Sequence, residues 1–90
     1  MTLKEVSNLT PDEIVALAKS MFFKCDEILT SETLEEDSED FSLLEDIEYS
    51  LNIYVMSYNT GHDNDKEEAI ESFKISLIQL PFVDKLFKAI

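Results

Sequence analysis

Four neighbouring residues carry side chains of metal-binding types, in the run HDND at residues 62–65. A calcium loop of the EF-hand kind needs alternating oxygen ligands, a glycine at its sixth position and a glutamate at its twelfth. Counted from Asp63, those positions hold Glu68 and Lys74, so the pattern fails twice. We therefore interpret the run as a polar turn between helices, and we expect neither a metal site nor a cofactor.

A nucleophilic site would need Cys25 and His62, the only residues of their kinds. A Cys–His pair works when the two side chains are in contact and a third group orients the histidine. Cys25 lies instead on an apolar helical stripe, where a thiol usually packs as a small hydrophobe. No serine stands in a nucleophile-elbow motif, and the single glycine, Gly61, excludes a glycine-rich phosphate loop. The sequence predicts no catalytic residue, so we expect a protein that is not an enzyme.

The lone cysteine and the absence of a long apolar run indicate where the protein works. One cysteine excludes an internal disulfide and fits a reducing compartment. The first residues are polar and charged, unlike a secretory signal, and no apolar run approaches the roughly 18 residues of a membrane span. We expect a cytoplasmic protein with no membrane contact.

The net charge is concentrated in the middle of the chain. Residues 25–65 hold 13 acidic side chains and no lysine or arginine, whereas the two flanks together hold 7 acids and 7 lysines. This set, which we name the acidic belt, consists of Asp26, Glu27, Glu32, Glu35, Glu36, Asp37, Glu39, Asp40, Glu45, Asp46, Glu48, Asp63 and Asp65. Such a charge repels nucleic acid and anionic membranes and attracts cationic surfaces, so we expect no direct binding of nucleic acid.

The acidic belt has two interpretations. In the first, its charge only keeps a small protein soluble. Solubility is usually reached by mixing both signs of charge, however, and excluding lysine from 41 consecutive residues costs self-repulsion. In the second interpretation the belt binds a cationic partner, beside an exposed tyrosine. The residues predicted to bind that partner are Glu32, Glu35, Glu36, Asp37, Glu39, Asp40, Glu45, Asp46, Glu48 and Tyr49.

Apolar spacing and capping signals predict the first helix and the loop that follows it. The run TPDE at residues 10–13 is a capping box with proline at the first helical position, and it begins a helix predicted over 11–29. Residues 30–40 contain one apolar residue, Leu34, which predicts an acidic loop. A second capping box at Thr33 could make the start of this loop helical.

A second helix is predicted over 39–60, with Gly61 as its stop. Tyr54 and Tyr58 lie on its main apolar stripe and are expected in the core. Three further apolar residues lie off that stripe and indicate a second buried face, namely Leu43, Ile53 and Met56.

A third helix is predicted over 65–80, capped by Asn64 or Asp65, and Pro81 either ends it or begins the next turn. Residues 82–90 form a short amphipathic tail that we expect to pack as a fourth helix. We therefore expect a single all-α domain over 1–90, a compact bundle of three long helices and a short C-terminal helix. The acidic loop would lie between the first and second helices.

The stretch 52–81 resembles a single tetratricopeptide repeat. The residues that match its packing positions are Ile53, Met56 and Ser57 in the first helix and Ala69, Phe73 and Pro81 in the second. Asn64 stands in place of the inter-helix glycine, while Thr60 and Ser76 depart from the family's usual aromatic residue and alanine. The resemblance implies a helical hairpin whose groove holds a peptide, and it implies no chemistry.

These observations lead to two hypotheses about function. In the first, the chain is a small acidic protein-binding module that covers a basic surface of a partner protein, as an inhibitor or immunity-type protein. The partner would be a toxin, a defence effector or a nucleic-acid-binding factor, with the carboxylates imitating phosphates. In the second, the chain is a tetratricopeptide-like adaptor or chaperone subunit that binds an amphipathic helix in a larger assembly, with the tail 82–90 as a further contact.

Overall fold

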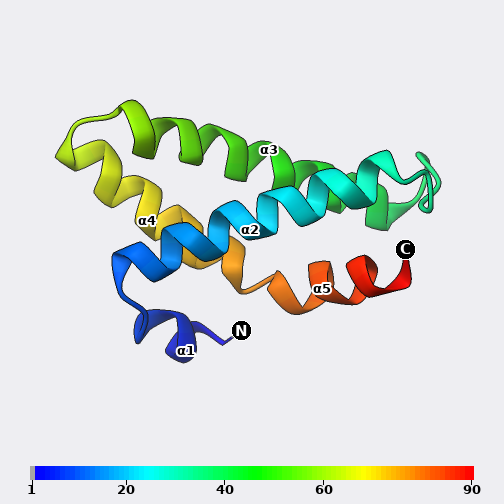
Figure 1. The fold of residues 1–90 in the computed structure, drawn as a ribbon, viewed down its shortest axis with the longest axis horizontal. Coiled ribbons are helices and arrows are strands. Elements are labelled where there is room, and N and C mark those ends of the chain that lie inside the picture. The colour runs from blue at the N-terminus through cyan, green and yellow to red at the C-terminus, as the bar shows by residue number, and fades with distance from the viewer. Residues whose placement is uncertain (1) are drawn as a thin grey trace.

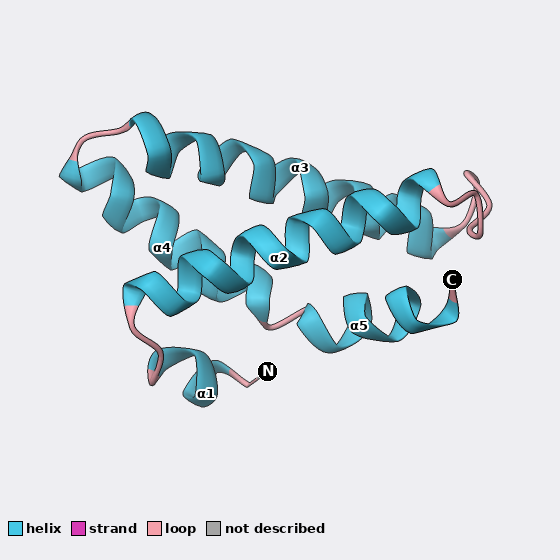
Figure 2. Cartoon of the chain, viewed as in Figure 1, coloured by secondary structure: helices cyan, strands magenta, loops and turns pink. Residues whose placement is uncertain are grey.

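The computed structural model describes residues 2–90, and within them it contains five helices and no strand (Figures 1 and 2). The helices are α1 (Leu3–Ser7), α2 (Pro11–Thr30), α3 (Glu39–Thr60), α4 (Asp63–Leu77) and α5 (Leu80–Ala89). The molecule is compact, with a radius of gyration of 13.1 Å. Within the described residues, no helix is both long enough and apolar enough to span a lipid bilayer.

The capping box predicted at the start of α2 is confirmed. The Thr10 hydroxyl accepts a hydrogen bond from the Glu13 backbone N–H (3.2 Å), and the Glu13 carboxylate accepts one from the Thr10 N–H (3.1 Å). Two of the N–H groups that a helix start leaves without helical partners are thereby satisfied, and Pro11 needs none. The cap fixes where the longest buried stripe of the protein begins.

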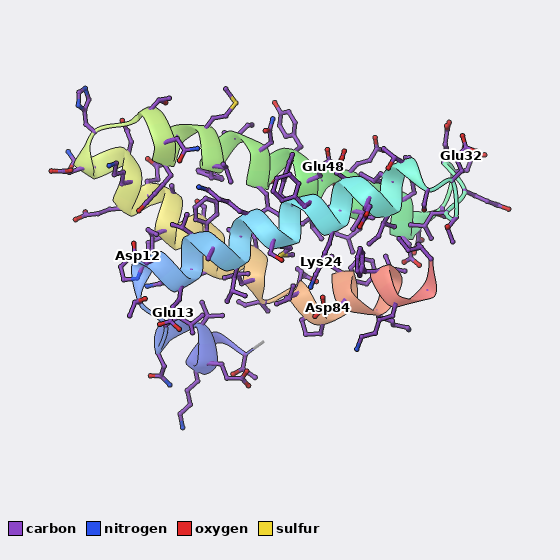
Figure 3. All side chains as sticks on the ribbon, viewed as in Figure 1. Asp12, Glu13, Lys24, Glu32, Glu48 and Asp84 are labelled. Carbon is purple, nitrogen blue, oxygen red and sulfur yellow. The ribbon has the colours of Figure 1, made fainter. Side chains whose placement is uncertain are left out.

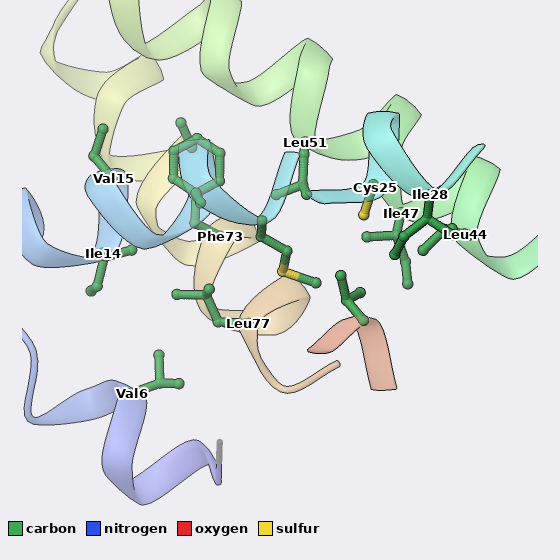
Figure 4. Packing of buried hydrophobic residues seen from close by; sticks show 14 residues of the cluster. Val6, Ile14, Val15, Cys25, Ile28, Leu44, Ile47, Leu51, Phe73 and Leu77 are labelled. Carbon is green, nitrogen blue, oxygen red and sulfur yellow. The ribbon is translucent and has the colours of Figure 1, made fainter. Parts of the chain in front are cut away.

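Helix α2 is the centre of the fold, because it packs against α3, α4 and α5, whereas α1 packs against α4 (Figure 1). One cluster of buried apolar residues joins all five helices (Figure 4). Its members are Val6, Ile14, Val15, Ala18, Met21, Cys25, Ile28, Leu44, Ile47, Leu51, Ala69, Phe73, Leu77 and Val83. Each large side chain buried there contributes about 1.5–3 kcal/mol, and within the described residues no polar or charged residue is buried with them.

The second buried face predicted for the helix over 39–60 is wrong. Leu43, Ile53 and Met56 are 41%, 40% and 60% exposed. Helix α4 is seven residues shorter than α3 (15 against 22), so it does not cover the full length of its neighbour. Leu43 lies near the start of α3, beyond the part that α4 runs beside, whereas Ile53 and Met56 lie on the side of α3 opposite its buried stripe of Leu44, Ile47 and Leu51.

Several helix boundaries differ from the prediction. Helix α4 begins at Asp63, and the Asp65 carboxylate accepts a hydrogen bond from the His62 backbone N–H (3.3 Å). Asn64 lies inside this first turn of α4, and the turn between α3 and α4 falls at Gly61 and His62. Pro81 is the second residue of α5, which agrees with the predicted alternative that it begins the next turn. As predicted, the tail packs on the core as a helix, with residues 82–89 in α5 and Val83 fully buried.

Residues 31–38 form the loop between α2 and α3, and the helical start at Thr33 is absent. Glu32 has a φ of 61°, and within residues 2–90 it is the one non-glycine residue with positive φ. Helix α1 was not predicted from the sequence. It is five residues long and contains the fully buried Val6, and a helix this short shows no apolar period in the sequence.

Candidate protein-binding surface

Folding divides the acidic belt between the two ends of the molecule. Eleven of its members lie on the C-terminal part of α2, on the loop or on the first half of α3, a region that runs in Figure 3 from Glu32 at the loop to Glu48 near the middle of α3. Asp63 and Asp65 lie at the α3–α4 turn, at the opposite end (Figure 1). The ten residues predicted to bind a partner all belong to the first end, which we name the acidic end.

Among the described residues, the carboxylates of the acidic end form no ion pair. The ion pairs within residues 2–90 join Lys24 to Asp84 (2.7 Å) and Lys74 to Glu71 (3.1 Å), and neither involves the acidic belt. Glu32, Glu35 and Glu36 are exposed, as are Asp37, Glu39 and Asp40. A partner that brings cations to this end therefore meets charges that are not already neutralised.

An acidic hollow lies between α2 and α3 beside this loop. Its volume is about 380 Å³, and its lining residues are Asp26, Leu29, Thr30, Glu45, Glu48, Tyr49 and Asn52. The four residues from α3 follow the helical spacing i, i+3, i+4 and i+7, which places them on one face toward α2. The hollow brings together Glu45, Glu48 and Tyr49 from the predicted set with Asp26, which the prediction left out of that set.

Tyr49 lies on the surface, as predicted. It is 69% exposed at the edge of the acidic hollow, whereas Tyr54 and Tyr58 are partly buried and pack against the core. An exposed phenol ring among carboxylates can lie over a lysine or guanidinium group that the carboxylates attract. The hollow therefore has the groups needed to hold a basic side chain.

Burial raises the pKa of Glu48, and the negative charges of Asp26 and Glu45 raise it further. The folded state therefore resists the ionisation of Glu48 more than the unfolded state does. Below the ordinary value of 4.5 the carboxyl is protonated in both states, and stability is lost as the pH rises through the raised value. A cation placed in the hollow would remove this penalty.

The substitution Glu48→Gln is therefore expected to raise Tm at pH 7, by a few degrees at most, because the hollow is open to solvent. The gain should disappear when the melting experiment is repeated below about pH 4. Glu36→Gln is the matched control, since it removes one charge from the exposed loop. Equal gains for both variants at pH 7 would show that overall repulsion, not the hollow, is responsible.

Cys25 is fully buried in the core cluster with Ile28, Leu44 and Ile47 (Figure 4). Burial raises the pKa of its thiol to about 12, and the charge of Glu48 adds to the rise. His62 lies at the exposed α3–α4 turn, so the structure does not bring the two residues into a catalytic pair. The interpretation of Cys25 as a packed hydrophobe is confirmed.

We expect the native thiol to react with a disulfide reagent such as DTNB at least about 1,000-fold more slowly at pH 8 than the thiol of the unfolded chain. At that pH a group with a pKa near 12 is ionised to roughly one part in 10⁴, and only the thiolate reacts. The release of thionitrobenzoate with and without concentrated guanidinium chloride measures the ratio. Rapid labelling of the native protein would contradict the buried position.

Sequence reasoning missed two features of this surface. The first is Asp26, which lines the hollow because α2 packs beside α3. Its i, i+3, i+4 spacing to Leu29 and Thr30 could have indicated that these three residues share one face of α2. The second is the outer side of α3, which was expected to be buried and is exposed instead.

Within residues 2–90, no three His, Cys, Asp or Glu side chains are grouped so as to hold a metal ion.

Comparison of the chain with protein-family models, with curated protein sequences and with solved structures found no match.

Proposed function

We propose that this chain is a small acidic protein-binding module that covers a basic surface of a partner protein, as an inhibitor or immunity-type protein. The observation that supports the proposal best is the acidic end, where eleven carboxylates gather without an ion-pairing lysine among the described residues. The partner is a toxin, a defence effector or a nucleic-acid-binding factor, whose natural surface for nucleic acid is cationic.

The proposed mechanism is occlusion without chemistry. The exposed carboxylates of the loop stand in the place of phosphates, and their field increases the rate of encounter by roughly 10- to 1,000-fold at low salt. A lysine or arginine of the partner then enters the acidic hollow between Glu45 and Glu48, against the ring of Tyr49. We expect a standard interface that buries about 1,200–2,000 Å² in total. Inhibition of this kind would take place in the cytoplasm, where the single cysteine stays reduced.

The experiment that tests the proposal is an affinity capture from the source cells in dilute buffer, with the full chain as bait and elution by a salt gradient. The expected result is a basic protein that leaves the bait as ionic strength rises, because charged contacts on a surface are screened by salt. Binding of purified partner to nucleic acid should then compete with binding to this chain. If no cationic macromolecule is retained in dilute buffer, the acidic belt serves solubility and the proposal is wrong.

The adaptor hypothesis is a second candidate, supported by one observation. Helices α3 and α4 form a hairpin within the stretch that resembles a tetratricopeptide repeat, and part of its outer side is apolar and exposed. The inner side of that hairpin is filled by α2, and the tail 82–90 is packed in α5. An amphipathic helix could therefore be held on the outer side alone.

A further inference from the structure

A shallow apolar groove lies on the outer side of α3 and α4. Its volume is about 210 Å³, and its lining residues are Leu43, Asp46, Ile47, Ser50, Ile75, Ser76 and Gln79. Leu43 is 41% exposed and Ile75 is 69% exposed. Two large, solvent-exposed apolar side chains thus line the groove, and most of its other lining residues are small or uncharged.

The groove and the acidic hollow lie on opposite flanks of α3. Residues 43, 46, 47 and 50 follow one helical stripe, whereas residues 45, 48, 49 and 52 follow another that faces α2. The groove stays open because α4 ends at Leu77 and α5 packs against α2. Nothing within the described residues covers this part of α3.

We propose that the groove binds an amphipathic, basic helix of the partner protein. The inference rests on the proposed function for the sign of the partner's charge. Leucine-like side chains of that helix lie on Leu43, Ile47 and Ile75, spaced at i, i+3 or i+4 as in other helix-in-groove complexes. The stripe from residue 39 to residue 50 is about 16 Å long at 1.5 Å per residue, which fits a helix of roughly 11 residues.

Charge decides between this occupant and a second copy of the chain. Asp46 is the one charged residue that lines the groove, and exposed Glu39 lies one turn before Leu43 on the same stripe. A second copy would bring its own net charge of −13 against these carboxylates. A basic helix instead places lysine or arginine beside Asp46 and Glu39 while its apolar side fills the groove.

Two synthetic helical peptides test the inference. The first carries leucines on one face and lysines on the other, and the second has every leucine replaced by glutamine with the same lysines. On the wild-type chain at low salt, the leucine peptide is expected to bind at least tenfold more tightly by fluorescence anisotropy. The variant Leu43→Gln/Ile75→Gln should lose that difference. The control variant Phe23→Gln/Met56→Gln, which changes two exposed apolar residues outside the groove, should keep it.

The possible results distinguish a failure of the groove proposal from a failure of the proposed function. Equal binding of the two peptides to the wild-type chain, or a difference that survives Leu43→Gln/Ile75→Gln, would overturn the groove and leave the proposed function standing. Failure of both peptides to bind in dilute buffer would overturn both. Sedimentation velocity adds the last comparison, because a wild-type dimer that Leu43→Gln/Ile75→Gln dissociates would identify a second copy as the occupant.

Discussion

Conversion of five carboxylates at the acidic end to amides is expected to slow association with the cationic partner by one to three orders of magnitude at low salt. The five residues are Glu35, Glu36, Asp37, Glu39 and Asp40, all of them exposed. The change removes five of the negative charges in a net −13 while keeping side-chain size almost constant. Stopped-flow or surface plasmon resonance with the captured partner gives the association rate directly.

A second five-fold variant separates the position of the charges from their number. It converts the exposed residues Glu5, Asp63, Glu67, Glu68 and Glu71 to amides, away from the acidic end. Both variants have the same net charge, so their association rates would be equal if the rate depended on net charge alone. With both variants measured at 0.1 M salt, we expect the second to slow association much less, because charges more than about 10 Å from the contact are then screened.

Salt provides an internal check on the same prediction. At 1 M salt the screening length falls to about 3 Å, so wild type and both variants should associate at similar rates. Circular dichroism should show unchanged helix content, since none of the five changed positions at the acidic end is buried. A wild-type rate that is independent of salt would contradict the proposed function.

The two longest helices could be predicted from the sequence because their signals are local. The capping box at Thr10 and the polar loop around Leu34 fix the ends of α2, and α3 begins and ends at residues 39 and 60 as predicted. Helix α1 could not be predicted, because its five residues are too few to show an apolar period. The boundary between α4 and α5 was missed because the proline at residue 81 is compatible with either position.

The candidate surface was predictable only in part. The charge of the acidic end follows from composition, so the loop carboxylates and Tyr49 could be named in advance. The hollow depends on how α2 and α3 lie against each other, and this brought Asp26 beside Glu48. The groove depends on where α4 ends. Leu43 and Ile75 line that groove together, and their exposure could not be read from the spacing of apolar residues within either helix.

The substitution Phe73→Ala is expected to lower the free energy of unfolding by about 3–5 kcal/mol. Phe73 is the largest fully buried side chain of the core, on the face of α4 that the cluster covers (Figure 4). A domain of this size is stabilised by only about 5–15 kcal/mol in total, so the variant should lose much of its stability. Urea denaturation followed by circular dichroism measures the difference.

Ile75→Ala is the matched control, because it removes a large apolar side chain from the same helix two residues away. Ile75 is 69% exposed, so we expect a change within about 0.5 kcal/mol. A large loss of stability in this variant would mean that Ile75 is needed for folding and that the groove belongs to the core. A small loss, beside a large one for Phe73→Ala, would show that folding does not require this isoleucine at the surface. Its apolar area would then be available to a partner, because nothing in the fold depends on covering it.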